Sequence, residues 1–185
     1  RAQARFMALR KTYRATARFG AVSTTGDPDG EITETGVVPS GALGLPTGEI
    51  RQRPPAFSAV KVGGERAYRL RRRGVAVEIP LRRSSVHELS VRRFEPPLLE
   101  LALHVGSGTY VRAIADALGG HCRTLRRIAV GPFRVDDADE GRVIPMLEAL
   151  PHLPEVPLAA EEVGRVLSGQ PSSGPGEGRA RLVGG

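Results

Sequence analysis

The chain has 185 residues, 27 Lys and Arg against 20 Asp and Glu, and a formal net charge of +7 at pH 7. Its hydrophobic content of 40% is enough for a packed core and excludes wholesale disorder. No apolar run approaches the ~20 residues of a transmembrane helix, and no signal peptide is visible. The single cysteine, Cys122, excludes an internal disulfide or a cysteine-rich zinc site. These features favour a cytoplasmic protein.

Residues 12–22 alternate between apolar and polar side chains, which predicts a half-buried strand. The residues of its apolar face are Tyr13, Ala15, Ala17 and Phe19. Residues 26–30, Gly-Asp-Pro-Asp-Gly, are typical of a turn, and residues 36–48 are loop-like.

A second group of elements is predicted from residue 56 onward. Residues 56–62 favour a strand, and a Gly-Gly turn leads into the arginine-rich segment 65–74. This segment is typical of a short helix that places Ala67 and Leu70 toward a core and ends at Gly74.

Residues 84–94 and 98–105 predict an antiparallel pair of strands joined by Glu-Pro-Pro. After a Gly-Ser-Gly turn the period becomes helical from Thr109 to Gly119. Arg112 and Asp116 lie one turn apart on the polar face of this helix, so we expect an ion pair between them.

Two short helices are predicted in the acidic tail, at residues 144–150 and 158–167, and residues 174–185 are rich in glycine. Strands outnumber helices, and the helices are interspersed among them. The predicted class is therefore α+β, with a largely antiparallel sheet flanked by helices.

Positive charge is concentrated in one part of the chain. Residues 1–134 contain 23 basic and 11 acidic residues, whereas residues 135–185 contain 4 basic and 9 acidic ones. Lysine occurs only at Lys11 and Lys61, so the excess is almost entirely arginine, which suits phosphate because its planar fork can bind two oxygens. Nucleic acid is the partner class that this distribution favours, over a merely solvated surface.

Familiar catalytic motifs are missing from these residues. The four histidines are scattered without chelating spacing, and no phosphate-binding or dinucleotide glycine motif occurs. Asp27 and Asp29 are interpreted as turn residues. Composition and spacing alone predict a basic α+β domain that binds nucleic acid.

Three blocks of sequence go further. They are KTYRATARFG at residues 11–20, RPPAFSAVK at 53–61 and GTYVRAI at 108–114, supported by TGDPDGE at 25–31 and LRRIAVGPF at 125–133. Together and in this order they closely resemble the TruB family of tRNA pseudouridine synthases. The resemblance extends from residue 5 to about residue 170.

The resemblance implies an isomerase that converts a flipped-out uridine of the tRNA T-arm (position 55 of tRNA) to pseudouridine, without a metal or a cofactor and as a monomer. It implies a mixed catalytic fold around a long central antiparallel sheet. Residues 1–150 would form the catalytic domain without its N-terminal part, and residues 151–185 a linker and the start of a truncated PUA-like RNA-binding domain.

Roles for single residues follow from the same resemblance. Tyr13 would stack on the target base, Tyr110 would line the base pocket with Leu125 packed against it, and Arg112 would pair with the nucleophilic aspartate. We expect these four residues to converge on one cleft, with Asp116 orienting Arg112. The residues expected to contact RNA phosphates are Lys61, Arg66, Arg69, Arg71, Arg72 and Arg73.

The resemblance is incomplete at one important point. The family's nucleophilic aspartate lies in a GGTLDPLATG-like motif, and no such motif occurs in these 185 residues. We therefore expect this chain alone to be inactive. Two alternatives stay open: a catalytically inactive RNA-binding or tRNA-folding module, and a structural RNA-binding protein.

Overall fold

The computed structural model describes residues 3–171 and 181–184, which divide into two compact units. The first unit ends at Asp136 and the second begins at Asp137. The assignment of residues 1–150 to a catalytic domain and of 151–185 to a linker and second domain stays a prediction.

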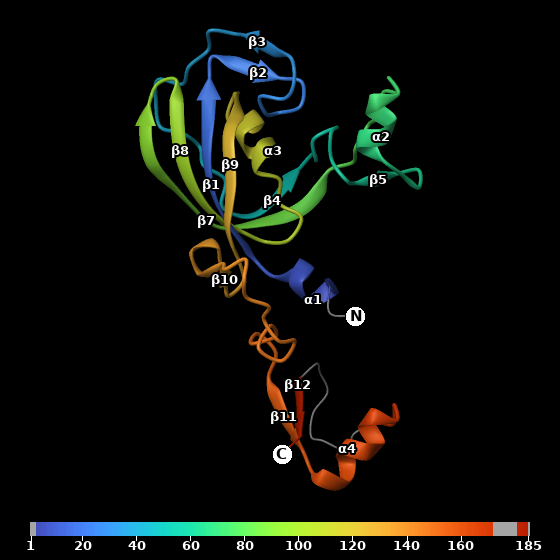
Figure 1. Ribbon diagram of the computed structural model, residues 1–185. Helices are drawn as coiled ribbons and strands as arrows, with labels where there is room; N and C mark the ends of the chain where they lie inside the picture. Colours follow the sequence, from blue (N-terminus) through green and yellow to red (C-terminus); the bar gives the residue numbers. More distant parts are fainter. Residues whose placement is uncertain (1–2, 172–180, 185) are drawn as a thin grey trace. The chain divides into compact units, whose positions relative to one another are not determined.

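The first unit is built on a six-stranded antiparallel sheet, which confirms the predicted α+β class (Figure 1). The two central strands, β1 and β8, lie between β9 on one side and β7 on the other. In spatial order the strands are β10 (Phe133–Arg134), β9 (Gly120–Val130), β1 (Lys11–Phe19), β8 (Leu98–Val105), β7 (Arg82–Glu95) and β4 (Gly48–Gln52).

The core lies on one face of this sheet, because the apolar residues of β1 and β8 pair with one another and point to the same face. Ala15 and Ala17 of β1 are buried and pair with Leu101 and Leu99 of β8. The helix α3 (Val111–Ala117) packs on this same face through Val111, Ile114 and Ala115. The predicted alternation of β1, the predicted strand at 98–105 and the predicted apolar face of this helix are confirmed.

Smaller elements surround the sheet. The helix α1 (Gln3–Ala8) precedes β1, and β2 (Ala21–Ser23) pairs with β3 (Ile32–Glu34). The hairpin of β5 (Lys61–Val62) and β6 (Glu65–Arg66) leads into the helix α2 (Ala67–Arg72), which stands to one side of the sheet (Figure 1). A separate cluster of Val60, Ala67 and Ile79 is buried beneath α2.

Three sequence-based expectations differ from the structure. The predicted strand at 56–62 is a loop, and only Lys61–Val62 forms a strand, because the preceding backbone is bonded to the start of α2 and to Arg112. The predicted helix at 144–150 is a series of turns. Conversely, β9 was not predicted, because its middle residues 123–127 are all exposed and show no alternation.

The second unit contains a parallel pair of strands and one helix. β11 (Glu155–Leu158) pairs with β12 (Arg181–Gly184), and α4 (Ala160–Leu167) confirms most of the helix predicted at 158–167. The short 3-10 turn η1 (Val135–Asp137) lies at the junction of the two units. No helix in the described part of the chain is long and apolar enough to cross a membrane.

Leu103 provides a test of the core. Its side chain is 1% exposed in the middle of β8, so Leu103→Ala should lower the free energy of unfolding by about 2–5 kcal/mol. The control is Val91→Ala on the adjacent strand β7, where the side chain is 43% exposed and the loss should stay within about 0.5 kcal/mol. Urea denaturation measures both, and equal losses would contradict the placement of the core.

The buried thiol of Cys122 predicts a pH dependence of stability. Burial raises its pKa from 9.0 to about 11, so the unfolded chain ionises this thiol first as the pH rises. The contribution of the protonated thiol to the free energy of unfolding is therefore complete below pH 9 and is lost as the pH rises from 9 to 11. Urea denaturation should show Cys122→Ala to be less pH-sensitive than the unsubstituted chain over this interval; parallel curves would contradict the burial.

Candidate active site around Arg112

Arg112 lies in the first turn of α3, where a glycine-containing turn delivers it to the core face of the sheet. The turn is anchored to β7, because the Gly106 N–H and the Thr109 hydroxyl both donate to the Ser85 carbonyl. Tyr110 then has an extended backbone and precedes the helix directly. The N–H of Tyr110 donates to the buried side chain of Gln52 at 3.1 Å.

The Arg112 guanidinium binds two separate loops. Its Nη1 donates to the Thr25 carbonyl at 3.1 Å and to Oδ2 of Asp27 at 2.6 Å. Its Nη2 donates to the Phe57 carbonyl at 3.1 Å. The side chains of Arg112 and Asp27 are only 22% and 23% exposed, so the pair is a charge-assisted bond largely shielded from water.

The turn that carries Asp27 is organised around this bond. Oδ1 of Asp27 accepts hydrogen bonds from the Thr25 hydroxyl at 2.6 Å and from the Asp29 N–H at 3.3 Å. Gly26 has φ of +77°, and a Cβ there would lie 3.4 Å from Cβ of Arg112. Glycine is therefore favoured by the backbone conformation, and a Cβ at this position would be in van der Waals contact with Arg112.

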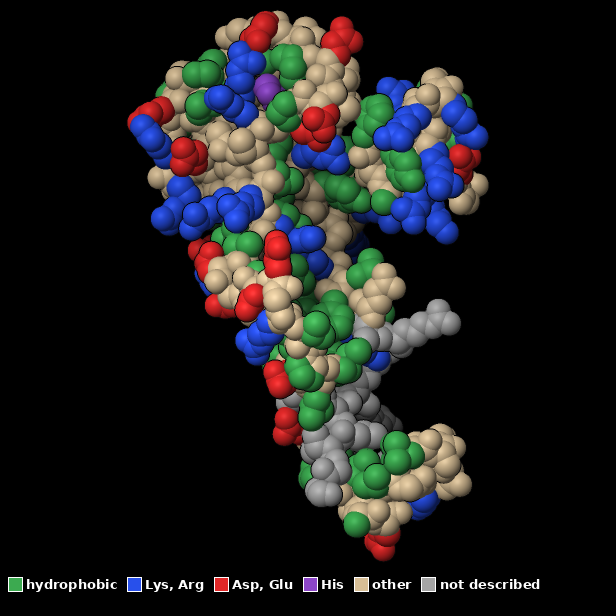
Figure 2. Space-filling model, in the orientation of Figure 1, with side chains coloured by type: hydrophobic (Ala, Val, Ile, Leu, Met, Phe, Trp, Pro, Cys, Tyr) green, Lys and Arg blue, Asp and Glu red, His purple; other side chains and the backbone are tan. Residues whose placement is uncertain are grey.

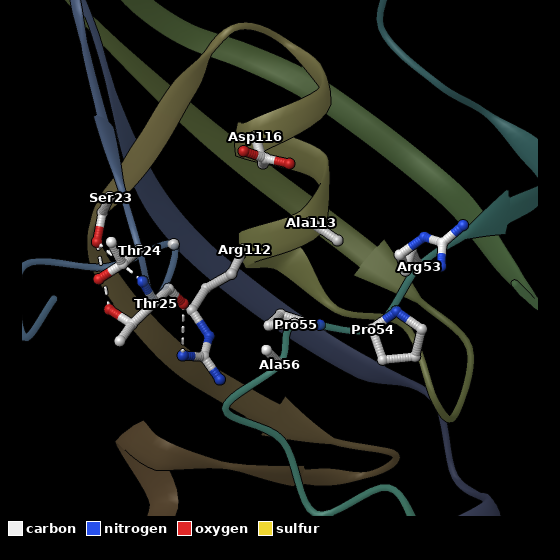
Figure 3. A pocket seen from close by; sticks show the side chains of 11 residues that line it. Ser23, Thr24, Thr25, Arg53, Pro54, Pro55, Ala56, Arg112, Ala113 and Asp116 are labelled. Atoms are coloured by element: carbon white, nitrogen blue, oxygen red, sulfur yellow. Dashed lines mark hydrogen bonds between the residues drawn. The ribbon is translucent and has the colours of Figure 1, made fainter. Parts of the chain in front are cut away.

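Arg112 lines two cavities. One has a volume of about 440 Å³ and is lined by Thr25, Asp27, Asp29, Phe57, Tyr68, Arg72 and Arg112. We call it the Tyr68 cavity. The other, of about 220 Å³, lies between α3, the 23–26 turn and the Arg53-Pro-Pro-Ala segment (Figure 3). Apolar rings, two guanidinium groups and carboxylates in the first cavity are a combination that suits a nucleotide.

The structure gives Arg112 a different partner from the one that the helical spacing predicted. Asp27, interpreted from sequence as a turn residue, makes the ion pair. Asp116 is exposed and lines the smaller cavity, apart from the Arg112 guanidinium (Figure 3). The reason is that Arg112 extends across to two loops, where it finds a carboxylate and two carbonyls, instead of lying along its own helix.

Tyr13 lies on the same face of the sheet as α3 but lines a third cavity. That cavity also contains Lys11, Arg127 and the 106–109 turn. The Lys11 ammonium donates to the carbonyls of Met7 and Leu9, and burial, followed by the nearby Arg127 charge, lowers its pKa. Tyr13 packs at the border of the main core.

The other two predicted residues are also placed around this face. Tyr110 packs against the cluster beneath α2. Leu125 is 44% exposed on β9 and pairs with Ala15, so its side chain shares the face of Tyr13. The four residues are thus divided between the cavity of Tyr13, the cavities of Arg112, the α2 cluster and the surface. Their convergence on one cleft stays a prediction.

The residues expected to contact RNA gather on and around α2, where Lys and Arg form a dense group (Figure 2). Arg66, Arg69 and Arg72 are exposed, and so is Lys61. Arg73 is paired with Glu65 at 2.6 Å, and Arg71 is half-buried. The first four side chains are therefore available to a polyanion.

Sequence reasoning missed the roles of Asp27, Gln52 and Tyr68. The signal for Asp27 was present in the TGDPDGE turn, but local spacing could not connect it to an arginine 85 positions away. Gln52 is buried at the end of β4 and its side chain joins Tyr110 to Ser84. The polar residues around Gln52 in the sequence do not indicate these long-range bonds. In the described part of the chain, no cluster of His, Cys, Asp or Glu could hold a metal ion.

The described residues thus form an α+β domain whose antiparallel sheet carries an arginine in the first turn of α3, beside a cavity of about 440 Å³ that the basic helix α2 also lines. Comparison with known proteins gives the family. Residues 1–111 match the N-terminal domain of the TruB family of pseudouridylate synthases. The chain belongs to this family, as the sequence resemblance predicted.

Its relatives include the tRNA pseudouridine synthase B of Chromobacterium violaceum, which is 37% identical over 87% of this chain and 61% of the relative. That of Nocardia farcinica is 40% identical over 84% of this chain and 55% of the relative. The chain thus spans about three fifths of the length of these proteins. Among solved structures, one described as "Crystal Structure of a Cbf5-Nop10-Gar1 Complex" is 25% identical, with a TM-score of 0.57 over 88% of this chain and 50% of that one. The pseudouridine-synthase fold is thereby confirmed.

Replacing Asp27 tests the assignment of the ion pair. Asp27→Asn leaves the partly buried Arg112 charge without its carboxylate and should lower the free energy of unfolding by about 1–3 kcal/mol. Asp116→Asn is the matched control, because this exposed carboxylate should contribute less than about 0.5 kcal/mol. If thermal denaturation ranked the two variants in the opposite order, the assignment of Asp27 would be wrong.

Proposed function

We propose that the protein containing this chain is a tRNA pseudouridine synthase that isomerises a flipped-out T-arm uridine. The observation that carries the proposal is the match along 84–87% of the chain with relatives named tRNA pseudouridine synthase B. We also propose that it acts on tRNA as a monomer, in the cytoplasm and without a metal or cofactor.

Base flipping is the first requirement of this reaction. A stacked uridine must leave its neighbours, which costs a few kcal/mol. An aromatic face offsets about 1–3 kcal/mol of this cost. In the proposal Tyr13 supplies that face, with Tyr110 and Leu125 lining the remainder of the base pocket.

The second requirement is a nucleophile that stays ionised and is correctly aimed. In the reaction the bond from C1′ to N1 breaks, the uracil rotates and a bond from C1′ to C5 forms. The C5 proton is then released and N1 takes up a proton, so the product is an isomer of the substrate. Arg112 would pair with the nucleophilic aspartate, because a fixed guanidinium favours the ionised carboxylate. Its bonds to Asp27 and to the two loop carbonyls support this role, since they fix the position of the guanidinium before substrate arrives.

RNA binding is assigned to the group of basic residues around α2. Phosphate contacts by Lys61 and the α2 arginines would position the T-arm without reading its sequence. Selectivity would then come from the folded shape of the arm and its splayed-out loop bases.

An RNA-binding or tRNA-folding module without catalysis is the second candidate. It depends on whether the full protein carries the GGTLDPLATG-like motif in which the resemblance places the nucleophile, a motif that these 185 residues do not include. The two candidates differ in one measurable property, the release of the proton from C5 of uridine.

Tritium release from tRNA labelled at C5 of uridine distinguishes the candidates. We expect no release above background from the 185-residue chain, and release once the N-terminal segment of the Chromobacterium violaceum relative is fused in front of it. In the fused protein, Arg112→Met should lower kcat by more than about 100-fold, because a charge aimed at the reacting groups is lost. Its affinity for tRNA should change only severalfold. Turnover by the unextended chain, or an inactive fusion that still binds tRNA, would contradict the assignment.

Salt dependence tests the RNA-binding surface. Changing Arg66, Arg69 and Arg72 together to glutamine should weaken binding to a T-arm stem-loop. It should also flatten the plot of log affinity against log salt by about two to three units, since each phosphate contact contributes about 0.7–0.9. The control changes three exposed arginines of β7 and β9, Arg92, Arg123 and Arg126, and removes the same charge. If the two triple variants had equal slopes of log affinity against log salt, RNA binding would depend on net charge alone and not on the α2 arginines.

A further inference from the structure

Tyr68 occupies an unusual position between two arginines of its own helix. Its ring lies under the guanidinium of Arg72 at 5.7 Å from the ring centre and under that of Arg69 at 5.9 Å. Nε of Arg69 also donates to the Tyr68 hydroxyl at 3.3 Å, and this bond lowers the pKa of the phenol. The ring is therefore a platform for cations.

Of the two arginines, only Arg72 lines the Tyr68 cavity. The reason is helical geometry: residues four apart lie on the same face of a helix, so Tyr68 and Arg72 are presented together. The same cavity is also lined by Arg112 and Asp27, which are already bonded to one another. The lining of the cavity thus includes both a closed ion pair and an arginine that lies over an aromatic ring.

Arg72 is the cation of this cavity that no carboxylate holds. Within the described residues its neighbour Arg73 is paired with Glu65, and Arg112 with Asp27, whereas no ion pair is formed by Arg72. A long, exposed side chain of this kind samples many rotamers in water, and an anion would have to select one of them. A contact with a ring face restricts the guanidinium without neutralising its charge.

We propose that Tyr68 is a positioning residue for RNA, whose ring holds the Arg72 guanidinium at the Tyr68 cavity to meet a phosphate of the nucleotide that enters there. The proposal rests on the proposed function in one respect, namely that the bound polyanion is a T-arm RNA. The effect of Tyr68 on affinity is exerted through Arg72. The hydroxyl is secondary, because its partner Arg69 is not among the residues that line the cavity.

Two single variants separate the ring from the hydroxyl. Tyr68→Phe keeps the ring, so the affinity for a T-arm stem-loop should stay within about twofold. Tyr68→Leu removes the ring, and the affinity should fall about fivefold, in line with a cation–π contact at a surface. Leucine is a good helix former and Tyr68 is only half-buried, so α2 should be retained, which circular dichroism and the melting temperature verify.

Two measurements, the salt slope and a double-mutant cycle, decide whether Tyr68 acts through Arg72 or stacks on a base. Tyr68→Leu should flatten the salt slope by about 0.7–0.9, the value of one phosphate, as Arg72→Gln does. In the Arg72→Gln background, Tyr68→Leu should have no further effect, whereas with Arg66→Gln, the matched control, the two losses should add.

Three results would overturn the positioning role while leaving the proposed function intact. They are an unchanged salt slope in Tyr68→Leu, additive losses with Arg72→Gln, which would indicate stacking on a base, and equal losses in the Phe and Leu variants. Absence of salt-sensitive binding by the unsubstituted chain would instead overturn the proposed RNA-binding function, and the role of Tyr68 with it.

Discussion

The arrangement of the site depends on one guanidinium. Arg112 leaves the first turn of α3 and joins the 25–27 turn to the loop at Phe57. Each bond alone is modest, but a planar fork that fills three acceptors at once fixes both loops in one geometry. The two cavities beside Arg112 exist because these loops are held on either side of it.

The same bond has an electrostatic consequence. The Arg112 side chain is 22% exposed and its guanidinium needs a counter-charge, which Asp27 provides. The cavity still keeps a second positive charge, because Arg72 also lines it. An incoming phosphate or carboxylate would therefore meet one free cation and one that is already oriented. Preorganisation of this kind lowers the reorganisation that binding or reaction requires.

Local patterns predicted β1 and α3 from their periods: Ala15 and Ala17 alternate with arginine and threonine, and Val111, Ile114 and Ala115 repeat helically. The turn residues at 95–97 and at Gly74 marked the bounds of β7, β8 and α2. The strand β9 could not be predicted from its sequence, because residues 123–127 are all exposed and show no alternation. Its place in the sheet is set by pairing with β1. The family resemblance singled out Arg112 but could not reveal Asp27 as its partner. A bond across 85 residues is determined by how the sheet and α3 assemble, which no local spacing records.

The small cluster under α2 has a dynamic consequence. Val60, Ala67 and Ile79 are buried in a cluster of their own, separate from the main core that β1, β8 and α3 share. An element with so few buried apolar side chains opens at a lower free energy than the whole domain unfolds. Backbone amides of α2 should therefore exchange with solvent through a local opening, while those of β1 and β8 exchange only when the sheet comes apart. We therefore expect α2, which carries the basic residues, to open and close as a local unit while the main sheet stays folded.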